Sequence, residues 1–170
     1  MSLILNGTDG IEFPDATDQA TSAIVSGYVP YTNLPAGSVL QVVSVSTQTS
    51  TSTVSTTFTS TGLSATITPK FNTSKILVLY NGAFYNANSG QAAVETLYRN
   101  STNLLTLGFN QQPPNENGLV MPASLNYLDS PATTSATTYA IYFKIGSSAA
   151  AIYQTISGEL ATLTLMEIVA

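Results

Sequence analysis

Apolar and polar side chains alternate most regularly in two segments of the C-terminal half. In residues 137–145, one face of an extended chain carries four apolar side chains, Tyr139, Ile141, Phe143 and Ile145. Residues 161–169 alternate in the same way, with Leu163 and Leu165 on the opposite face from Ile168. Because successive side chains of a strand point to opposite faces, this period of two predicts half-buried β-strands in both segments.

Residues 75–85 differ, because this segment begins with a nearly continuous apolar run, Ile76-Leu77-Val78-Leu79-Tyr80. Runs of this kind are typical of strands that are covered on both faces. In a sandwich of two sheets, the domain's own core covers only one of these faces. A partner subunit is the simplest cover for the other, so the run predicts contact between copies of the chain.

Strand-like segments continue through the rest of the chain after residue 37. Turn residues such as those at 100–103 and 146–148 separate them, and no long amphipathic helix interrupts them. Without crossover helices, strands at this spacing predict an all-β fold, an antiparallel β-sandwich (jelly roll), over residues 38–170. The predicted strands are 38–45, 53–59, 63–68, 75–85, 93–99, 104–109, 119–128, 137–145, 150–157 and 161–169.

Residues 44–61 form a tract rich in Ser and Thr, SVSTQTSTSTVSTTFTST, with no charged residue, Gly or Pro. A disordered, glycosylated stalk and a pair of strands facing water or another copy are both compatible with it. Stalks usually carry Pro, whereas β-branched Thr and Val suit a pleated surface. We therefore predict that the tract forms strands in the polar half of the sandwich, with Val54 and Phe58 as sparse apolar anchors.

Residues 1–37 differ in character and are predicted to form an extended N-terminal docking arm and linker. They carry four acids and no base, and Pro14, Pro30 and Pro35 interrupt any longer element. Their apolar patches are too small to fold alone. The arm docks either on its own domain, as a terminal strand, or on a neighbouring protein. The predicted docking residues are Leu3, Ile4, Leu5, Ile11 and Phe13.

Charged residues make up only 8% of the 170 residues, against roughly 25% in an average soluble domain. The net charge is −5, and the four basic residues form no run. This distribution argues against a nucleic-acid partner, which requires a basic footprint, and against binding to an anionic membrane surface. A weakly charged surface opposes self-association poorly. We therefore expect partner subunits to cover much of the surface, the alternative being a monomer with a neutral surface.

The chain contains no His, Cys or Trp. It therefore lacks the side chains of Ser-His-Asp and Cys-His nucleophile systems, and those of imidazole or thiolate metal sites. We expect no enzymatic activity, no metal and no cofactor. Four oxygen-bearing side chains of the arm lack the EF-hand register for calcium and are interpreted as solvated: Asn6, Asp9, Glu12 and Asp15.

Glycosidase chemistry remains an alternative, because it requires only two facing carboxyl groups. Glu116 and Asp129 fall in predicted loops, where we interpret them as solvated acids. Glu95 and Arg99 are four residues apart on one predicted strand, so we expect a surface ion pair between them. Some of the nine Tyr and six Phe side chains are candidates for a glycan-binding face, although core or subunit interface is the preferred interpretation.

Five stretches carry a resemblance to known proteins. LILNGTDGIEFPDATDQ, near the N-terminus, resembles a segment common in tailed-bacteriophage virion proteins. The stretches TGLSATITPKFNTSKILVL, LYRNSTNLL, LDSPATTSATTYAIYFK and ATLTLMEI resemble parts of a recurring domain in the same proteins. The order of these pieces also resembles the tumour necrosis factor-like and complement globular-domain-like jelly roll. Together these stretches extend over most of the chain's length, from residue 3 to residue 168.

The resemblance implies a non-enzymatic virion structural protein, made in the host cytoplasm and located in the virion. The tumour necrosis factor-like family forms compact trimers through apolar and aromatic faces near the threefold axis, so a homotrimer is expected. The resemblance makes the following residues candidates for the subunit interface: Ile76, Val78, Tyr80, Tyr139, Ile141, Phe143, Leu163, Leu165 and Ile168.

The expected role is a trimeric capsid decoration or cement protein, anchored by its arm to other virion proteins such as the major capsid protein or portal and tail proteins. The chain lacks the collagen-like or coiled-coil shaft of longer fibre proteins, which favours a compact attached module. The alternative is the receptor- or glycan-binding tip of a short head or tail fibre, with loops 110–118 and 129–136 contacting a host-surface glycan. A third hypothesis is a polysaccharide depolymerase.

Overall fold

The structure, a computed structural model, describes residues 4–6, 10–12, 18–19, 29–86, 93–105, 119–146, 152–154 and 158–170. The chain divides into two compact units, Met1–Ser38 and Val39–Ala170. Each unit is described by itself.

Three short strands of the first unit pair with one another. They are β1 (Ile4–Asn6), β2 (Gly10–Glu12) and β3 (Asp18–Gln19), and they form an antiparallel sheet in the order β1-β2-β3. In the register of β1 and β2, Leu5 lies opposite Ile11, so strand pairing brings together the two apolar patches of the arm. A single turn of 3₁₀ helix, η1 (Tyr31–Asn33), follows Pro30.

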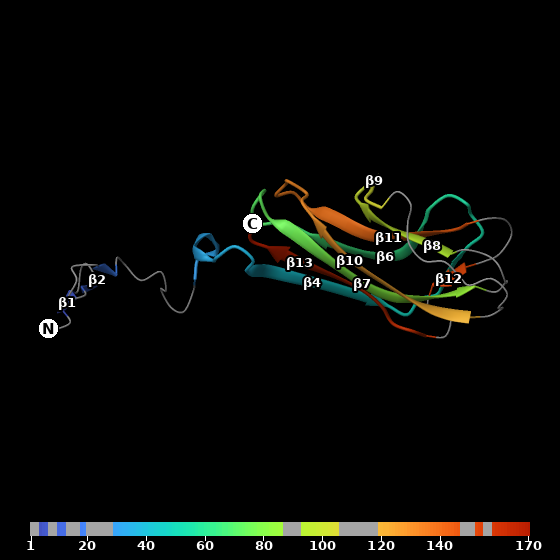
Figure 1. Cartoon of the computed structure of the whole chain (residues 1–170), viewed down its shortest axis with the longest axis horizontal. Helices are drawn as coiled ribbons and strands as arrows, with labels where there is room; N and C mark the ends of the chain where they lie inside the picture. Colours follow the sequence, from blue (N-terminus) through green and yellow to red (C-terminus); the bar gives the residue numbers. More distant parts are fainter. Residues whose placement is uncertain are drawn as a thin grey trace. The chain divides into compact units, whose positions relative to one another are not determined.

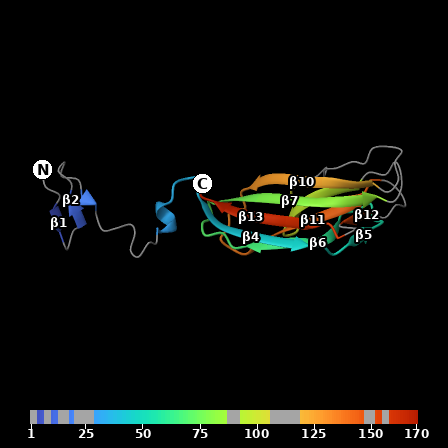
Figure 2. The ribbon, with the colours of Figure 1, turned by 90° about the horizontal axis from the view of Figure 1, so that it is seen from below.

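The second unit consists of two antiparallel sheets packed face to face (Figure 1). Figure 2 shows β10, β7, β13 and β4 of the larger sheet side by side. The larger sheet contains β4 (Val39–Thr47), β5 (Thr51–Thr53), β7 (Lys75–Asn86), β10 (Leu119–Asp129), β12 (Ile152–Gln154) and β13 (Ala161–Ile168). The smaller sheet contains β6 (Thr59–Ile67), β8 (Ala93–Arg99), β9 (Thr102–Asn103) and β11 (Thr137–Ile145).

The long strand β7 is the centre of the larger sheet. It pairs with β10 along its whole length on one side, and with β13 and then β12 on the other. The strand order is β4-β13-β7-β10 in this sheet and β6-β11-β8-β9 in the smaller one. The chain therefore passes repeatedly from one sheet to the other, as in a jelly roll. The predicted fold class, an antiparallel β-sandwich of the jelly-roll type, is confirmed.

The hydrophobic core lies between the sheets and follows the predicted alternation. Alternate side chains of β11 are buried, with Tyr139, Ile141 and Phe143 completely inaccessible. The inward side chains of β6, β7 and β13 meet them from the other strands: Leu63, Ala65, Ile67, Ile76, Val78, Tyr80, Phe84, Ala161, Leu163 and Leu165.

The Ser/Thr tract contributes to three strands: the end of β4, the whole of β5 and the start of β6. Residues 54–58, between β5 and β6, form a turn instead of a strand. Between β5 and β6, Thr53 Oγ1 accepts a hydrogen bond from the Ser55 N–H at 3.1 Å, and Ser55 Oγ accepts one from the Thr57 N–H at 3.0 Å. Short hydroxyl side chains that bond their own backbone favour turns over strand pairing. The predicted strand 53–59 is therefore broken, and Val54, which is 68% exposed, is not the anchor that we expected.

Gly82 leaves room for Tyr80, one of the two completely buried tyrosines of the core. A Cβ atom added at Gly82 would overlap the Tyr80 hydroxyl and lie 2.8 Å from the ring carbon that carries it. The Tyr80 hydroxyl donates a 2.8 Å hydrogen bond to Glu95 Oε1 on β8, in the opposite sheet. The ring therefore cannot move away without losing this bond.

We predict that Gly82→Ala lowers the free energy of unfolding by about 1–3 kcal/mol, the usual cost of overpacking a core. Urea unfolding followed by circular dichroism measures this. Removing the Tyr80 hydroxyl should relieve the closest overlap, so Tyr80→Phe should cost less in the Gly82→Ala background than in the wild type. If the losses of stability from Gly82→Ala and Tyr80→Phe simply add in the double variant, overlap with the Tyr80 hydroxyl is not the cause of the cost.

Candidate assembly surface

The structure corrects the residues predicted for the subunit interface. Eight of the nine have at most 1% of their surface exposed within a single chain: Ile76, Val78, Tyr80, Tyr139, Ile141, Phe143, Leu163 and Leu165. These side chains fill the domain's own core, so they have no surface left to offer to a second copy. Only Ile168 points to the outside and is partly exposed.

The outward face of the larger sheet carries a row of apolar side chains that the described residues leave partly or about half exposed. In the strand register, Val42 lies beside Met166, Met166 beside Leu77, and Leu77 beside Leu128. This row crosses all four strands β4, β13, β7 and β10. Neighbouring rows add more apolar side chains, and we call the whole set the apolar band: Val39, Val42, Leu77, Leu79, Leu128, Met166 and Ile168.

The outward face of the smaller sheet is different, because hydroxyl groups dominate it. Ser60, Ser64 and Thr66 of β6 are exposed, and the hydroxyls of Thr66 and Thr138 lie 2.8 Å apart in a hydrogen bond across to β11. Such a face is well hydrated in an isolated chain. The two outer surfaces of the sandwich therefore differ in polarity.

A small aromatic cluster interrupts this polar face. The rings of Tyr98 and Tyr142 stack with centroids 4.1 Å apart, and Phe58 meets Tyr98 edge-on at 6.5 Å. The Lys144 ammonium group lies 4.6 Å from the centroid of Phe58, in a cation–π arrangement. All four side chains are partly buried. Phe58 thus anchors its turn to the sheet, as predicted for it.

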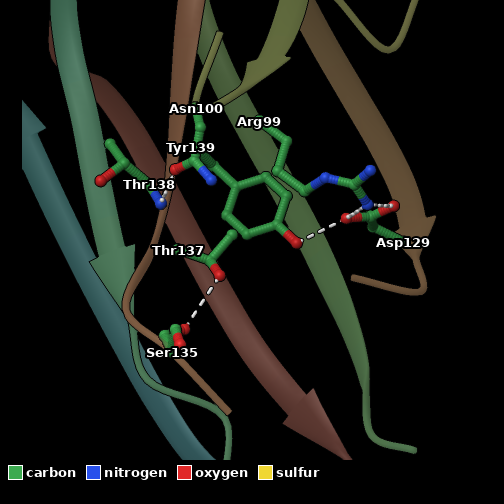
Figure 3. A network of polar contacts seen from close by, with 7 residues as sticks. All are labelled: Arg99, Asn100, Asp129, Ser135, Thr137, Thr138 and Tyr139. Atoms are coloured by element: carbon green, nitrogen blue, oxygen red, sulfur yellow. Dashed lines mark hydrogen bonds and ion pairs between the residues drawn. The ribbon is translucent and has the colours of Figure 1, made fainter. Parts of the chain in front are cut away.

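Asp129 ties the two sheets together instead of lying in a solvated loop, as Figure 3 shows. It closes β10 and is 6% exposed. Both of its oxygens accept hydrogen bonds from the Arg99 guanidinium of β8 at 2.8 Å, and Oδ2 accepts one from the Tyr139 hydroxyl of β11 at 2.6 Å. Burial, together with the hydrogen bond to Asp129, raises the pKa of Tyr139. Arg99 therefore pairs with Asp129 and not, as expected, with Glu95.

Glu167 is completely buried at the end of β13 and holds a loop in place. Its Oε1 accepts hydrogen bonds from the N–H groups of Lys70 at 2.6 Å and Phe71 at 3.4 Å, in the connection between β6 and β7. Its Oε2 accepts a 2.5 Å bond from the Gln41 side chain on β4. One carboxylate thus connects β13, β4 and a loop that comes from the opposite sheet.

Glu95 is the third buried acid, and it lies within the core itself. Its Oε1 accepts the hydrogen bond from Tyr80, whereas its Oε2 has no hydrogen-bond partner among the described residues. Burial raises the pKa of this carboxyl well above its usual range, and the Tyr80 hydrogen bond offsets only part of this effect. Burial thus favours the protonated form of Glu95, and the predicted surface ion pair with Arg99 does not form, because Glu95 is completely buried and Arg99 bonds to Asp129.

The described part of the chain contains no group of three or more His, Cys, Asp or Glu side chains placed to hold a metal ion. Within the same part, no helix has the length and apolar character needed to cross a membrane. Glu116 of the hypothetical carboxylate pair lies outside the described residues. Its predicted partner, Asp129, is engaged by Arg99 and Tyr139.

The predicted docking residues of the arm are described only in part. Ile4 and Leu5 lie in β1 and Ile11 lies in β2, whereas Leu3 and Phe13 fall outside the described residues. Their role in docking stays a prediction.

Comparisons with known proteins give a likeness of fold but no family. No protein-family model matches the chain, and no curated protein matches it either. The crystal structure of the infectious bursal disease virus VP2 subviral particle aligns with 76% of this chain and 38% of its own, at 14% sequence identity and a TM-score of 0.42. A likeness at this level carries no information on function.

The raised pKa of Glu95 leads to a prediction about pH. The folded chain keeps this proton at pH values where the unfolded chain has lost it, so the stability of the wild type should fall as the pH rises above the ordinary range of a glutamic acid. Glu95→Gln removes the titrating group and should flatten this dependence. The free energies of unfolding of both proteins, measured by urea unfolding at pH values from about 4 to about 9, test this prediction.

The variant Tyr80→Phe serves as the matched comparison for Glu95→Gln. Because the Tyr80 hydrogen bond favours the ionised carboxylate, its loss should extend the fall in stability to higher pH. A Glu95→Gln protein whose stability follows pH as the wild type does would contradict a protonated Glu95.

The Asp129 cluster leads to a prediction about stability. Asp129→Ala leaves Arg99 and Tyr139 without their partner and should lower the free energy of unfolding by about 2 kcal/mol. Tyr139→Phe removes only one hydrogen bond and should cost about 1 kcal/mol. The double variant, measured by urea unfolding, should cost less than the sum of the two, because both changes remove the same bond. A strictly additive result would show that the two residues do not act together.

Proposed function

We propose that the protein is a non-enzymatic structural protein of a virion, a capsid decoration or cement protein that forms homotrimers. In this role residues 39–170 are the assembling jelly-roll module, and the N-terminal arm fastens it to other proteins of the particle. The resemblance to tailed-bacteriophage virion proteins and to trimeric tumour necrosis factor-like domains supports this assignment.

The observation that carries the proposal is the uneven character of the two outer surfaces. One is hydroxyl-rich, whereas the other bears the apolar band with Val39, Val42 and Leu128 about half exposed. Large apolar patches on soluble domains mark interaction sites. A function that consists of assembly requires such a surface and requires no catalytic group.

The use of the acids in the second unit also supports a structural role. Glu95, Asp129 and Glu167 are buried and bonded to side chains or backbone of other strands. None of the three is left to face a substrate across a cleft. In a glycoside hydrolase, by contrast, two carboxyl groups flank an open site.

Arm docking on the particle would stabilise the shell by mass action, because a ligand that binds only the assembled state favours that state. The arm's strands pair within their own small sheet. Its apolar residues Leu3, Ile4, Leu5, Ile11 and Phe13 are the proposed contacts with the major capsid protein or with portal or tail proteins.

A fibre tip that binds a host-surface glycan is the second candidate. The stacked pair Tyr98 and Tyr142 favours it, since aromatic rings beside hydroxyl groups suit the apolar face and polar rim of a sugar. Glycan-array binding that is lost in Tyr142→Ala would support this alternative over the cement role.

We predict that deleting residues 1–18 abolishes binding to particles that lack the protein, and leaves the fold and the oligomeric state unchanged. Co-sedimentation with particles measures binding, and circular dichroism with sedimentation equilibrium measures fold and oligomeric state. The control is Ser64→Lys, which changes the hydroxyl-rich face and should bind particles as the wild type does. A truncated protein that still decorates particles would contradict the role of the arm.

A further inference from the structure

We propose that the apolar band is the surface on which a second copy of this chain sits. The inference rests on the proposed function in one respect, that copies of the protein assemble with one another. It replaces the buried residues of the sequence prediction with side chains that are free to make contact.

Exposure and register support the band as a contact surface. Val39, Val42 and Leu128 are 50%, 54% and 53% exposed, although all three are apolar. Leu77 and Leu79 of β7 and Met166 of β13 lie between them and are partly exposed. The band therefore runs from β4 to β10 without a break.

The charge of this face indicates which partner it fits. Ser44 and Asn126 share the row of Leu79, and the next row carries Ser46, Asn81 and Ser124; all five side chains are neutral. Lys75 is the charged side chain at the margin of the band, beside Ile168. A neutral face offers nothing to attract a strongly acidic or basic partner, and it does not repel another surface that is poor in charge. Because charged residues make up only 8% of this chain, a second copy offers such a surface.

The outward face of the larger sheet is also large enough for a contact between two protein chains. β10 has 11 residues, so the face is about 37 Å long, and its four strands make it about 19 Å wide. The whole outward face, of which the band is one end, therefore has a flat area of at most about 700 Å², of the same order as the roughly 800 Å² of accessible surface that each partner contributes to a specific interface.

The first experiment compares oligomeric states of the full-length chain by sedimentation equilibrium. The double variant Val42→Lys, Leu128→Lys places charges at two exposed positions of the band, and Ser64→Lys places one on the opposite surface. We expect the wild type and Ser64→Lys to associate, and the double variant to have a dissociation constant larger by roughly tenfold or more. Melting curves confirm that all three proteins are folded.

The second experiment identifies what covers the band. Because the chain has no cysteine, Leu128→Cys provides a single site for a nitroxide spin label. If a second copy covers the band, the label should become immobile as the protein concentration rises and mobile on dilution. Immobility that does not depend on concentration would indicate cover by the chain's own residues and would overturn the proposal.

A monomeric wild type, or a folded double variant that associates as strongly as the wild type, would also overturn it. These outcomes are separate from a failure of the virion role. Copies that associate through the band but never bind particles would refute the cement function and leave this interface standing. A double variant that remains associated and still decorates particles would refute only the interface.

Discussion

The structure depends on the alternation of side chains along β7, which has a paired strand on each side. Its inward positions fill the core, with Ile76, Val78 and Tyr80 completely buried. Its outward positions hold Leu77 and Leu79, which the described residues leave partly exposed. The same strand thus stabilises the sandwich through one face and leaves an apolar surface on the other. Successive side chains of a strand point to opposite faces. A shift of β7 by one residue would therefore move Ile76, Val78 and Tyr80 out of the core and bring Leu77 and Leu79 into it.

Few charges are present in the second unit, and the structure uses several of them internally. Asp129 joins β10 to β8 and β11, and Glu167 joins β13 to β4 and to the loop after β6. Except for the Tyr139–Asp129 bond, these bonds join residues at least 30 positions apart in the sequence. Breaking such a bond leaves a buried polar group without a partner, which costs more than the bond contributes when it is intact. The outer surface carries little charge in part because Glu95, Asp129 and Glu167 are buried.

An assembling protein benefits from the resulting arrangement. The core and the buried bonds of the second unit lie within the chain, so a copy would be ordered before it met another. The hydroxyl-rich surface would keep the isolated copy hydrated, and the apolar band carries Lys75 as a charge at its margin. An interface between rigid surfaces requires little ordering when it forms, which favours affinity.

The sequence by itself determined the fold class, because the period of two in 137–145 and 161–169 and the spacing of the turns are local signals. It also indicated that residues 76–80 are covered on both faces. It could not tell which face of residues 76–80 is the core, since a continuous apolar run has no period, and the resemblance to trimeric jelly rolls pointed to inward residues as the interface. Only the tertiary structure decided that Leu77 and Leu79 face outward, and that Glu95 and Asp129 are buried. Those outcomes depend on which strands become neighbours, and that pairing joins residues far apart in the chain.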